Sequence, residues 1–368
     1  MNSGSLQDRW DSSAPMVFSG APTPQDIPAL TDGEIAFATS GSTGEPKFVV
    51  HSHASLEASA SMVNRHLGAI AGDRWLVALP SYHVGGFGVH VRAWQLGSVA
   101  IELGERWRPA DFVQSTRDHQ IAWSSLVPAQ VSDLVDLGES APEQLRGIIV
   151  GGGALTPAIA AQAHALGWPV VQSYGMTETG SQVATGLPTE PFSPTLPILQ
   201  GWEARVPSGG TGLLELRGAA LAHRLLHRKT DGHWRSTQLT DSEGWFSTSD
   251  HVELDGSDQL TWKGRADSMV KVLGELVSLD LLQTELDALS PNAVIIDLPS
   301  DRDRELVLAL EPGSADAEGL LERFNADRPG FQRVSRHVIL DSPLPRSGLG
   351  KLRRSELREL LLPSRTEP

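Results

Sequence analysis

Short apolar runs alternate with amphipathic stretches through the first half of the chain. The apolar runs predict buried strands at 34–38, 75–79, 98–103, 121–126, 147–150 and 169–172. Apolar positions three or four residues apart predict helices over 54–67, 128–137 and 157–166. The last two begin with proline, which suits the first turn of a helix. Strand–helix alternation of this kind is typical of α/β layers around a largely parallel sheet.

The pattern changes after about Gly180. The segment 186–212 is rich in proline and glycine and predicts a surface connector, and runs at 212–218, 245–247 and 259–262 predict short antiparallel strands. The last hundred residues return to a smaller α+β pattern, with strands expected at 292–298, 305–310 and 337–340 and a helix at 315–325.

These patterns predict an α/β fold with two domains of unequal size. The large N-terminal domain would hold layered α/β structure with mostly parallel sheets plus a β-rich subdomain, and the small C-terminal domain would be α+β. The expected divisions are a loosely ordered lead-in at 1–30, the large domain at 31–266 and the small domain at 267–368, with the boundary near Asp267.

Composition narrows the function classes. The chain has 368 residues, with 30 Lys+Arg against 45 Asp+Glu, so its net charge of −15 argues against non-specific binding to nucleic acid or anionic membranes. It has no cysteine, which excludes disulfides, thiolate catalysis and zinc–thiolate sites. The first twenty residues lack a signal pattern, and no apolar run approaches the roughly 20 residues of a membrane span. We therefore expect a soluble, cytoplasmic protein.

One string, Thr39-Ser-Gly-Ser-Thr-Gly-Glu-Pro-Lys47, has the composition of a phosphate-binding loop. It follows the first predicted strand and precedes the first predicted helix, where backbone N–H groups and hydroxyls can surround a phosphate chain. Ser40, Ser42 and Thr43 would add donors, and Lys47 would add positive charge. It is not a Walker A loop, because no Gly-Lys-Ser/Thr ends it. For a generic loop of this composition, a flexible turn is the alternative interpretation.

Eight segments in order, this string included, resemble the acyl-adenylate-forming enzymes, the family of acyl- and aryl-CoA ligases, peptide-synthetase adenylation domains and luciferases. The other seven are SYHVGGF at 81–87, GGGA at 151–154, YGMTET at 174–179, GLLELRG at 212–218, WFSTSD at 245–250, GRAD at 264–267 with Lys271, Gly274 and Glu275, and SGLGK at 347–351. The resemblance extends from about residue 34 to 356.

The resemblance implies that a carboxylate attacks the α-phosphorus of ATP and that the acyl-adenylate then reacts with coenzyme A. Negative charge crowds at such a centre, so the site must supply cations and oriented donors. Glu178 is implied as the Mg²⁺ ligand and Thr177 as a phosphate contact. Asp250 is implied as the acceptor for both ribose hydroxyls, and Arg265 as a donor beside ribose or phosphate. Taken singly, Glu178 could instead complement a helix dipole, and Arg265 could be a solvated surface arginine.

The full set of implied site residues has two parts. The catalytic residues would be Lys351, Glu178, Thr177 and His83. The nucleotide-binding residues would be Thr39, Ser40, Gly41, Ser42, Thr43, Gly44, Lys47, Gly152, Gly153, Ala154, Ser173, Tyr174, Gly175, Met176, Asp250, Arg265, Lys271 and Gly274.

The resemblance also implies that the small domain is mobile and rotates about Asp267. One orientation would present Lys351, in its glycine-flanked loop, to the adenylation transition state. The other would present the face from Lys271 to Glu275 for thiol attack. A hinge of this kind needs only a few residues able to absorb a backbone rotation.

The short chain, with its phosphate loop already at residue 39, most resembles the 2-succinylbenzoate–CoA ligases of menaquinone biosynthesis. In that group the succinyl carboxylate is activated and polar groups hold the ring carboxylate. His83 would line the acyl pocket, although a lone histidine is more often structural, and the Gly85–Gly86 pair would thin the pocket wall for a flat ring.

Other functions stay open at this point. They are another short aryl- or acyl-CoA ligase, an adenylase that loads a carrier protein and, in a different class, a non-catalytic nucleotide-binding module. The expected partners are an aromatic carboxylate, ATP and CoA, with no nucleic acid and no membrane insertion, and a homodimer stays open.

Overall fold

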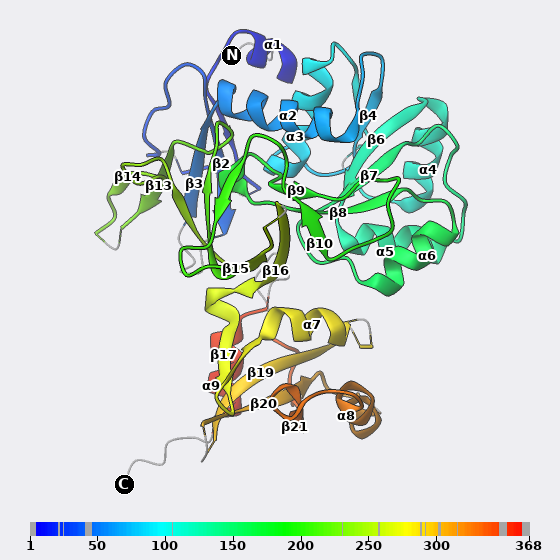
Figure 1. The fold of residues 1–368 in the computed structure, drawn as a ribbon, viewed down its shortest axis with the longest axis vertical. Helices are drawn as coiled ribbons and strands as arrows, with labels where there is room; N and C mark the ends of the chain where they lie inside the picture. The colour runs from blue at the N-terminus through cyan, green and yellow to red at the C-terminus, as the bar shows by residue number, and fades with distance from the viewer. Residues whose placement is uncertain are drawn as a thin grey trace. The chain divides into compact units, whose positions relative to one another are not determined.

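The chain divides into two units, each described by itself. The computed structural model describes residues 5–20, 23–24, 26–40, 46–104, 106–229, 231–256, 258–287, 289–290, 292–300, 303–314, 316–345 and 352–362. The first unit comprises Met1–Thr248 and Val252–Trp262, and the second comprises Ser249–His251 and Lys263–Pro368. Figure 1 shows the elements of both units along the chain.

A six-stranded sheet forms the α/β part of the first unit. Its strand order is β5 (Ala100–Glu102), β4 (Arg74–Val77), β6 (Ile121–Leu126), β7 (Gly147–Val150), β8 (Val170–Tyr174) and β9 (Ala184–Thr185). All neighbours are parallel except β8 and β9, which are antiparallel. The predicted α/β class with a mostly parallel sheet is confirmed.

Helices cover both faces of this sheet, which explains why its strands read as continuous apolar runs. They are α2 (His53–Leu67), α3 (Val84–Gln95), α4 (Pro109–Asp118), α5 (Pro128–Leu137) and α6 (Pro157–Ala165). Successive residues of β4 face opposite cores: Trp75 packs with α2 and α3, and Leu76 with α4, α5 and α6. Figure 1 shows α4, α5 and α6 together on their side of the sheet.

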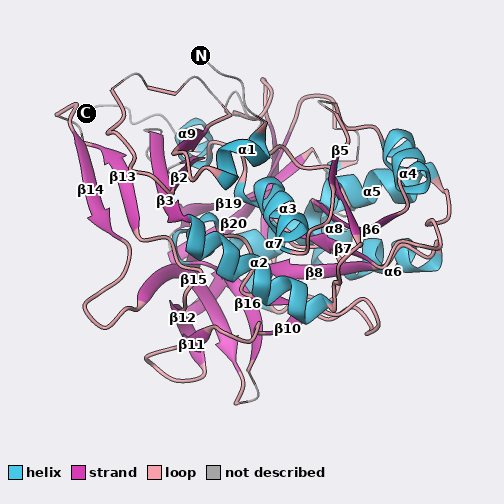
Figure 2. Ribbon diagram, turned by 90° about the horizontal axis from the view of Figure 1, so that it is seen from above, coloured by secondary structure: helices cyan, strands magenta, loops and turns pink. Residues whose placement is uncertain are grey.

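A second sheet carries the predicted phosphate loop. Its order is β1 (Met16–Phe18), β2 (Glu34–Ser40), β3 (Pro46–Ser52), β13 (Arg224–Arg228) and β14 (Trp234–Gln238). Figure 2 shows β13 and β14 at the edge of this sheet. The string 39–47 was expected to precede a helix, but it joins the antiparallel strands β2 and β3, and α2 begins only at His53. The reason is that Phe48, Val49 and Val50 are fully buried, aromatic or β-branched residues that suit a strand.

The first thirty residues differ from the expected loose lead-in. They contain the helix α1 (Leu6–Asp11) and the strand β1, which pairs parallel to β2. Trp10 is buried and stacks on the His53 ring at 4.0 Å, and Met16 is buried beside it in the same core. Two large apolar side chains therefore anchor a segment whose composition looked irregular.

A third sheet replaces part of the expected connector at 186–212. Its order is β10 (Thr195–Pro197), β16 (Gln259–Arg265), β15 (Phe246–Leu254), β12 (Thr211–Arg217) and β11 (Glu203–Arg205). Each of the two short strands β10 and β11 pairs antiparallel with a longer strand at an edge of the sheet. Because β10 lies at the edge, its Pro197 costs no ladder hydrogen bond in the interior of the sheet.

The second unit is a small α+β layer. After the turn η2 (Ala266–Ser268) come β17 (Met269–Val272), β18 (Glu275–Ser278), α7 (Leu279–Asp287), β19 (Ala293–Ser300), β20 (Asp303–Leu310), α8 (Ala317–Asn325), η3 (Gly330–Gln332), β21 (Val334–Ile339) and α9 (Arg354–Leu361). The sheet order is β19, β20, β21, and the last pair is parallel. Residues of α7 and α8 pack on one face of this sheet, and Leu357 of α9 packs on the other.

The described helices include none that is both long enough and apolar enough to cross a lipid bilayer.

Candidate active site

Lys47 and Glu178 lie far apart in the sequence and meet in the first unit. Lys47 is the second residue of β3, and Glu178 lies in the turn η1 (Thr177–Thr179) that follows β8. The Lys47 Nζ lies 3.7 Å from the Glu178 Oε1, and their side chains are 34% and 19% exposed. The pair is loose and partly accessible, so the carboxylate keeps lone pairs for another cation.

The close return of the chain after β8 shapes the turn at Glu178. A Cβ on Gly175 would lie 1.7 Å from the Ser181 carbonyl oxygen, so only glycine fits there. Ser181 itself has a φ of +128°, which is a strained conformation for a residue with a side chain. The Thr179 hydroxyl donates to the Met176 carbonyl at 2.9 Å and accepts from the Met176 N–H at 3.1 Å. The local sequence thus fixes Thr177 and Glu178 at the end of β8.

The predicted nucleotide-binding residues at 152–154, which match the adenine-side turn of the resembled family, and those at 173–176 gather at the carboxyl ends of β7 and β8. The amide of Gln172 accepts from the Leu155 N–H at 2.7 Å and donates to the Gly153 carbonyl at 3.1 Å. The Ser173 hydroxyl donates to the Val150 carbonyl at 3.1 Å. Because β7 and β8 are parallel neighbours, the residues that follow them share one edge of the sheet, where α/β folds bind their ligands. The structure therefore brings together Gly152, Gly153, Ala154, Ser173, Tyr174, Gly175 and Met176.

The predicted phosphate loop is described only at its two ends. Thr39 lies opposite Lys47 in the β2–β3 register, and its hydroxyl donates to the Lys47 carbonyl at 3.4 Å. Ser40 is the last residue of β2. The predicted residues Gly41, Ser42, Thr43 and Gly44 lie outside the described residues, and so does Lys351.

Besides Lys351, four predicted site residues belong to the second unit, and all four are among the described residues. The Arg265 Nη1 lies 3.9 Å from the Asp250 Oδ1, and its Nε donates to the Asp267 Oδ1 at 3.0 Å. Burial opposes the charge of Arg265, but the hydrogen bond and charge of Asp267 together with Asp250 outweigh it and raise the pKa of the guanidinium. Lys271 is exposed on β17, and Gly274 makes the tight turn to β18 with a φ of +86°.

The place of His83 in an acyl pocket stays a prediction. His83 is the exposed residue that precedes α3, and its ring lies 4.6 Å from the Tyr82 ring. A Cβ on Gly86 would lie 2.3 Å from the Pro80 carbonyl oxygen. Gly86 therefore allows α3 to pack against the preceding chain, and the part of the glycine pair in thinning a pocket wall stays a prediction.

Sequence reasoning missed Arg92, a fully buried arginine on α3. Its guanidinium donates to the hydroxyls of Ser125 and Ser181, each at 3.2 Å, and lies over the Trp75 ring at 5.5 Å from the centroid. Within the described residues it forms no ion pair. Burial lowers its pKa to about 10, so it stays charged near neutral pH. The available signal was a lone arginine within the apolar helix VGGFGVHVRAW.

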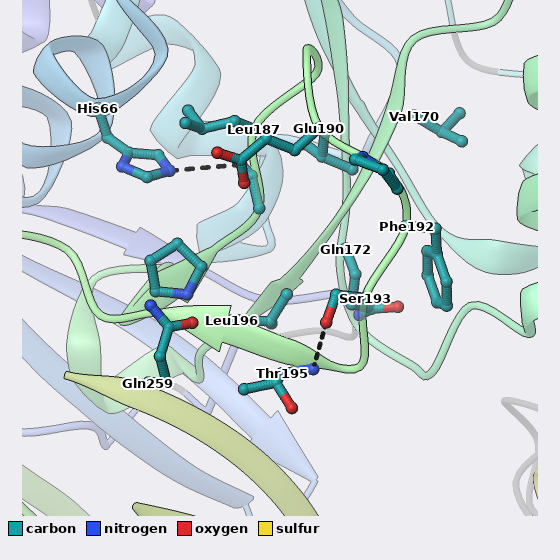
Figure 3. Close-up of a pocket in the computed structure, with 14 residues that line it drawn as sticks. His66, Val170, Gln172, Leu187, Glu190, Phe192, Ser193, Thr195, Leu196 and Gln259 are labelled. Atoms are coloured by element: carbon teal, nitrogen blue, oxygen red, sulfur yellow. Dashed lines mark hydrogen bonds between the residues drawn. The ribbon is translucent and has the colours of Figure 1, made fainter. Parts of the chain in front are cut away.

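A cavity of about 320 Å³ lies behind the adenine-side turn, and Gln172 is among its lining residues. Figure 3 shows His66 at one side of this cavity, where its ring contacts the Gly186 carbonyl at 3.3 Å, and Phe192 at the other. Its lining includes Glu190 but none of the predicted site residues. The Gln172 amide is already committed to the adenine-side turn, so this cavity is separate from the predicted nucleotide edge.

The set of described donors fits a magnesium ion held with a nucleotide. No three His, Asp or Glu side chains of the described residues gather into a site that would hold a metal ion by themselves. Mg²⁺ typically takes one or two carboxylates and fills its other positions with phosphate oxygens and water. Glu178 is partly accessible and only loosely paired with Lys47, so its single carboxylate meets that requirement.

Comparison with known proteins places the chain in a family. The family described as "AMP-binding enzyme" matches residues 5–222, more than half of the chain. A 2-succinylbenzoate–CoA ligase from Staphylococcus epidermidis is 27% identical over 331 residues, which cover 87% of this chain and 68% of that protein. One from Bacillus velezensis is 27% identical over 355 residues, covering 92% and 71%.

Solved structures agree on the fold. An O-succinylbenzoate coenzyme A synthetase (MenE) from Bacillus subtilis, in complex with ATP and magnesium ion, has a TM-score of 0.75 at 23% identity, covering 88% of this chain and 69% of that one. An ATP-bound MatB from Rhodopseudomonas palustris has a TM-score of 0.71 at 21% identity, covering 89% and 67%. The family match, supported by the shared fold, shows that the chain belongs to the AMP-binding enzyme family.

Proposed function

We propose that this protein is an ATP-dependent acid–CoA ligase that acts on 2-succinylbenzoate. In the first step a carboxylate oxygen of the acid attacks the α-phosphorus of ATP, and pyrophosphate leaves with the electrons of the broken P–O bond. In the second step the thiol sulfur of CoA attacks the acyl carbonyl, and AMP leaves. The observation that carries the proposal is the meeting of Lys47 and Glu178 at 3.7 Å within a chain of the AMP-binding family.

The residues of this chain would act on the first step through charge. Lys47 would neutralise the phosphate chain, and Thr177 would donate to it. Glu178 would hold Mg²⁺, which supplies further charge neutralisation when bound. In the second unit Asp250 would accept from the ribose hydroxyls beside Arg265, and Lys351 would contribute its charge at the transition state.

Two observations support 2-succinylbenzoate as the acid. The relatives reported above carry that substrate in their names. In addition, Arg92 is a buried cation that, among the described residues, donates to the neutral hydroxyls of Ser125 and Ser181. Because a buried charge without a counter-ion is costly, a second substrate carboxylate would be stabilised there. An acid with two carboxylates, one activated and one bound, matches this arrangement.

The test is pyrophosphate release with a panel of acids, with and without CoA. We expect release with 2-succinylbenzoate and Mg²⁺ alone, and thioester only when CoA is added. The Lys351→Ala variant should lose about 10²–10³-fold or more in adenylate formation yet still form thioester from supplied acyl-adenylate. Pyrophosphate release with a different acid would favour another aryl- or acyl-CoA ligase. Transfer of the acyl group only to a carrier protein would favour a loading adenylase. No pyrophosphate release with any acid would favour a non-catalytic module.

A further inference from the structure

His51 is a buried histidine that no predicted function uses. It lies on β3 with none of its surface exposed. Its Nε2 is 2.7 Å from the carbonyl oxygen of Thr177, and its Nδ1 is 3.0 Å from the Ser55 hydroxyl. The first contact joins residues 126 positions apart and ends on the backbone of the turn that carries Glu178.

The hydrogen-bond partners of His51 determine which of its ring nitrogens carries the proton. A carbonyl oxygen can only accept, so the Nε2 must carry the proton and donate it to Thr177. Burial lowers the pKa of His51 to about 4, so the ring is neutral near pH 7 and its Nδ1 can accept from Ser55. The ring therefore serves as a fixed, neutral donor aimed at one carbonyl.

The strand β3 contacts the turn at two places. Lys47 and His51 are four residues apart, so their side chains leave β3 on the same face. Lys47 reaches the Glu178 carboxylate, and His51 holds the carbonyl of the preceding residue. The ring also packs against the end of the turn, because a Cβ on Gly180 would lie only 3.5 Å from the His51 Cε1.

Further bonds secure the far side of the turn. The Ser59 hydroxyl of α2 donates to the Gly180 carbonyl at 2.9 Å, and the Ala222 N–H donates to the Glu178 carbonyl at 2.9 Å. These bonds fix the carbonyls of Glu178 and Gly180. The Thr177 carbonyl accepts from the Gly180 N–H at 3.2 Å within the turn and from His51 at 2.7 Å, so His51 is the donor that ties this carbonyl to β3.

We propose that His51 is a positioning residue for metal–nucleotide binding, holding Thr177 and Glu178 where they meet the magnesium-bound phosphates of ATP. The inference rests on the proposed function and deepens it. Residues that orient a metal ligand from behind typically change metal affinity or activity by roughly 10–100-fold when they are replaced.

The experiment compares three variants at this position. A glutamine side-chain NH₂ can take the place of the imidazole Nε2–H, whereas an asparagine NH₂ lies nearer the Nδ1 position and a leucine has no donor. We measure the Mg²⁺ concentration that half-saturates ATP binding by calorimetry, and then pyrophosphate release. We expect His51→Asn and His51→Leu to raise that concentration roughly tenfold or more and His51→Gln to stay within a few-fold of wild type.

The matched control is His164, whose Nε2 contacts the Val170 carbonyl at 3.0 Å in the same unit, away from the turn. His164→Leu should leave the Mg²⁺ requirement unchanged even where its thermal unfolding temperature falls like that of His51→Leu. Thioester formation from supplied acyl-adenylate, which needs no magnesium-bound triphosphate, should stay within a few-fold in all variants.

The outcomes separate the two proposals. If His51→Asn matches His51→Gln, or if His164→Leu raises the Mg²⁺ requirement as much as His51→Leu does, the positioning role is wrong. Should His51→Leu fail to fold, the Gln and Asn variants, which keep a polar side chain, decide the matter. Wild-type protein that binds Mg²⁺–ATP but activates no acid would contradict the proposed function and leave the His51 comparison valid.

Discussion

At the scale of single residues, sequence motifs indicated some of the proposed functional side chains, and their burial in the structure revealed others. Lys47 and Glu178 belong to recognisable strings, and the structure brings them together. Arg92 and His51 belong to no such string. What distinguishes His51 is a buried hydrogen bond to a distant carbonyl. What distinguishes Arg92 is that it has no ion-pair partner among the described residues, and neither property can be deduced from the residue type.

The proposed role of Arg92 can be tested by a conservative substitution. Replacing it with lysine keeps the charge but loses the planar pair of donors to Ser125 and Ser181. We expect the KM for 2-succinylbenzoate to rise by roughly tenfold or more, while the KM for ATP changes little, because a charged hydrogen bond is worth about 1.5–3 kcal/mol. Steady-state kinetics with each substrate varied in turn measures this.

Arg146 supplies the control for Arg92. It also lies over a tryptophan ring, Trp123, but it is half exposed and paired with Asp73 at 2.7 Å. Arg146→Lys should leave the KM for the acid unchanged. An unaltered KM in Arg92→Lys would remove Arg92 from the acid site.

At the scale of elements, periodicity predicted the α/β core well and the irregular parts poorly. The strands β6 and β7 occupy the predicted ranges, because their apolar runs are buried on both sides. The helix α5 also occupies its predicted range, and Val131 and Leu134 on its apolar face are buried. The strands β3 and β10 were missed. Their existence depends on partners that are distant in sequence, and a local pattern does not contain that information.

The pair Gly85 and Gly86 gives a prediction at this scale. A Cβ on Gly86 would lie 2.3 Å from the Pro80 carbonyl, whereas a Cβ on Gly85 would meet only the flexible end of Leu79 at 3.6 Å. Gly86→Ala should destabilise the protein by roughly 1–3 kcal/mol, because the backbone of α3 must move away. Gly85→Ala should be neutral or stabilising by up to about 1 kcal/mol through helix propensity. Urea unfolding of both variants tests this, and equal effects would contradict the packing argument.

Glu34 links two strands of the second sheet and makes stability depend on pH. Its carboxylate accepts from Arg224 of β13 at 2.7 Å and from His223 at 2.8 Å. Burial opposes the charge, but these bonds and one from the Thr31 N–H lower the pKa to about 2. Because the pKa of Glu34 is lower in the folded protein than its ordinary value of 4.5, its carboxylate stabilises the fold at pH values above 4.5, by roughly 3 kcal/mol at most. This contribution is lost as the pH falls from 4.5 toward 2.

The measurement compares wild type with Glu34→Gln by urea unfolding across pH. The free energy of unfolding of wild type should exceed that of Glu34→Gln by the largest amount above pH 4.5, and this difference should shrink as the pH falls below that value. The exposed Glu57→Gln serves as the control and should show no such trend. A constant difference between Glu34→Gln and wild type would show that the bonds to Glu34 add no pH dependence.

At the scale of the whole molecule, the predicted division near Asp267 stays a proposal about motion. The chain leaves the first unit for the last time between Trp262 and Lys263, a few residues before Asp267. Asp267 lies in the short turn η2 and accepts from Arg265 at 3.0 Å. The boundary was predicted from a sequence motif. The proposed rotation is a change between two conformations, and its test is therefore kinetic.

Asp267→Pro tests the rotation. Proline fixes its own φ and restricts the residue before it, so the backbone change required of a hinge is hindered. We expect thioester formation to slow more than adenylate formation, measured as two separate half-reactions. Asp267→Ala, which also loses the bond to Arg265, is the control, and equal losses of both half-reactions in the proline variant would contradict the two-orientation scheme.

The position of Arg92 over the ring of Trp75 has a practical consequence. An indole whose face lies against a charge changes its emission when that charge is compensated, and Trp75 is fully buried, away from quenching solvent. Trp75 is thus an intrinsic fluorescence probe at the point where the second carboxylate is proposed to bind. Titrating the acid while following tryptophan fluorescence would report its arrival directly, without a label and before any chemistry occurs.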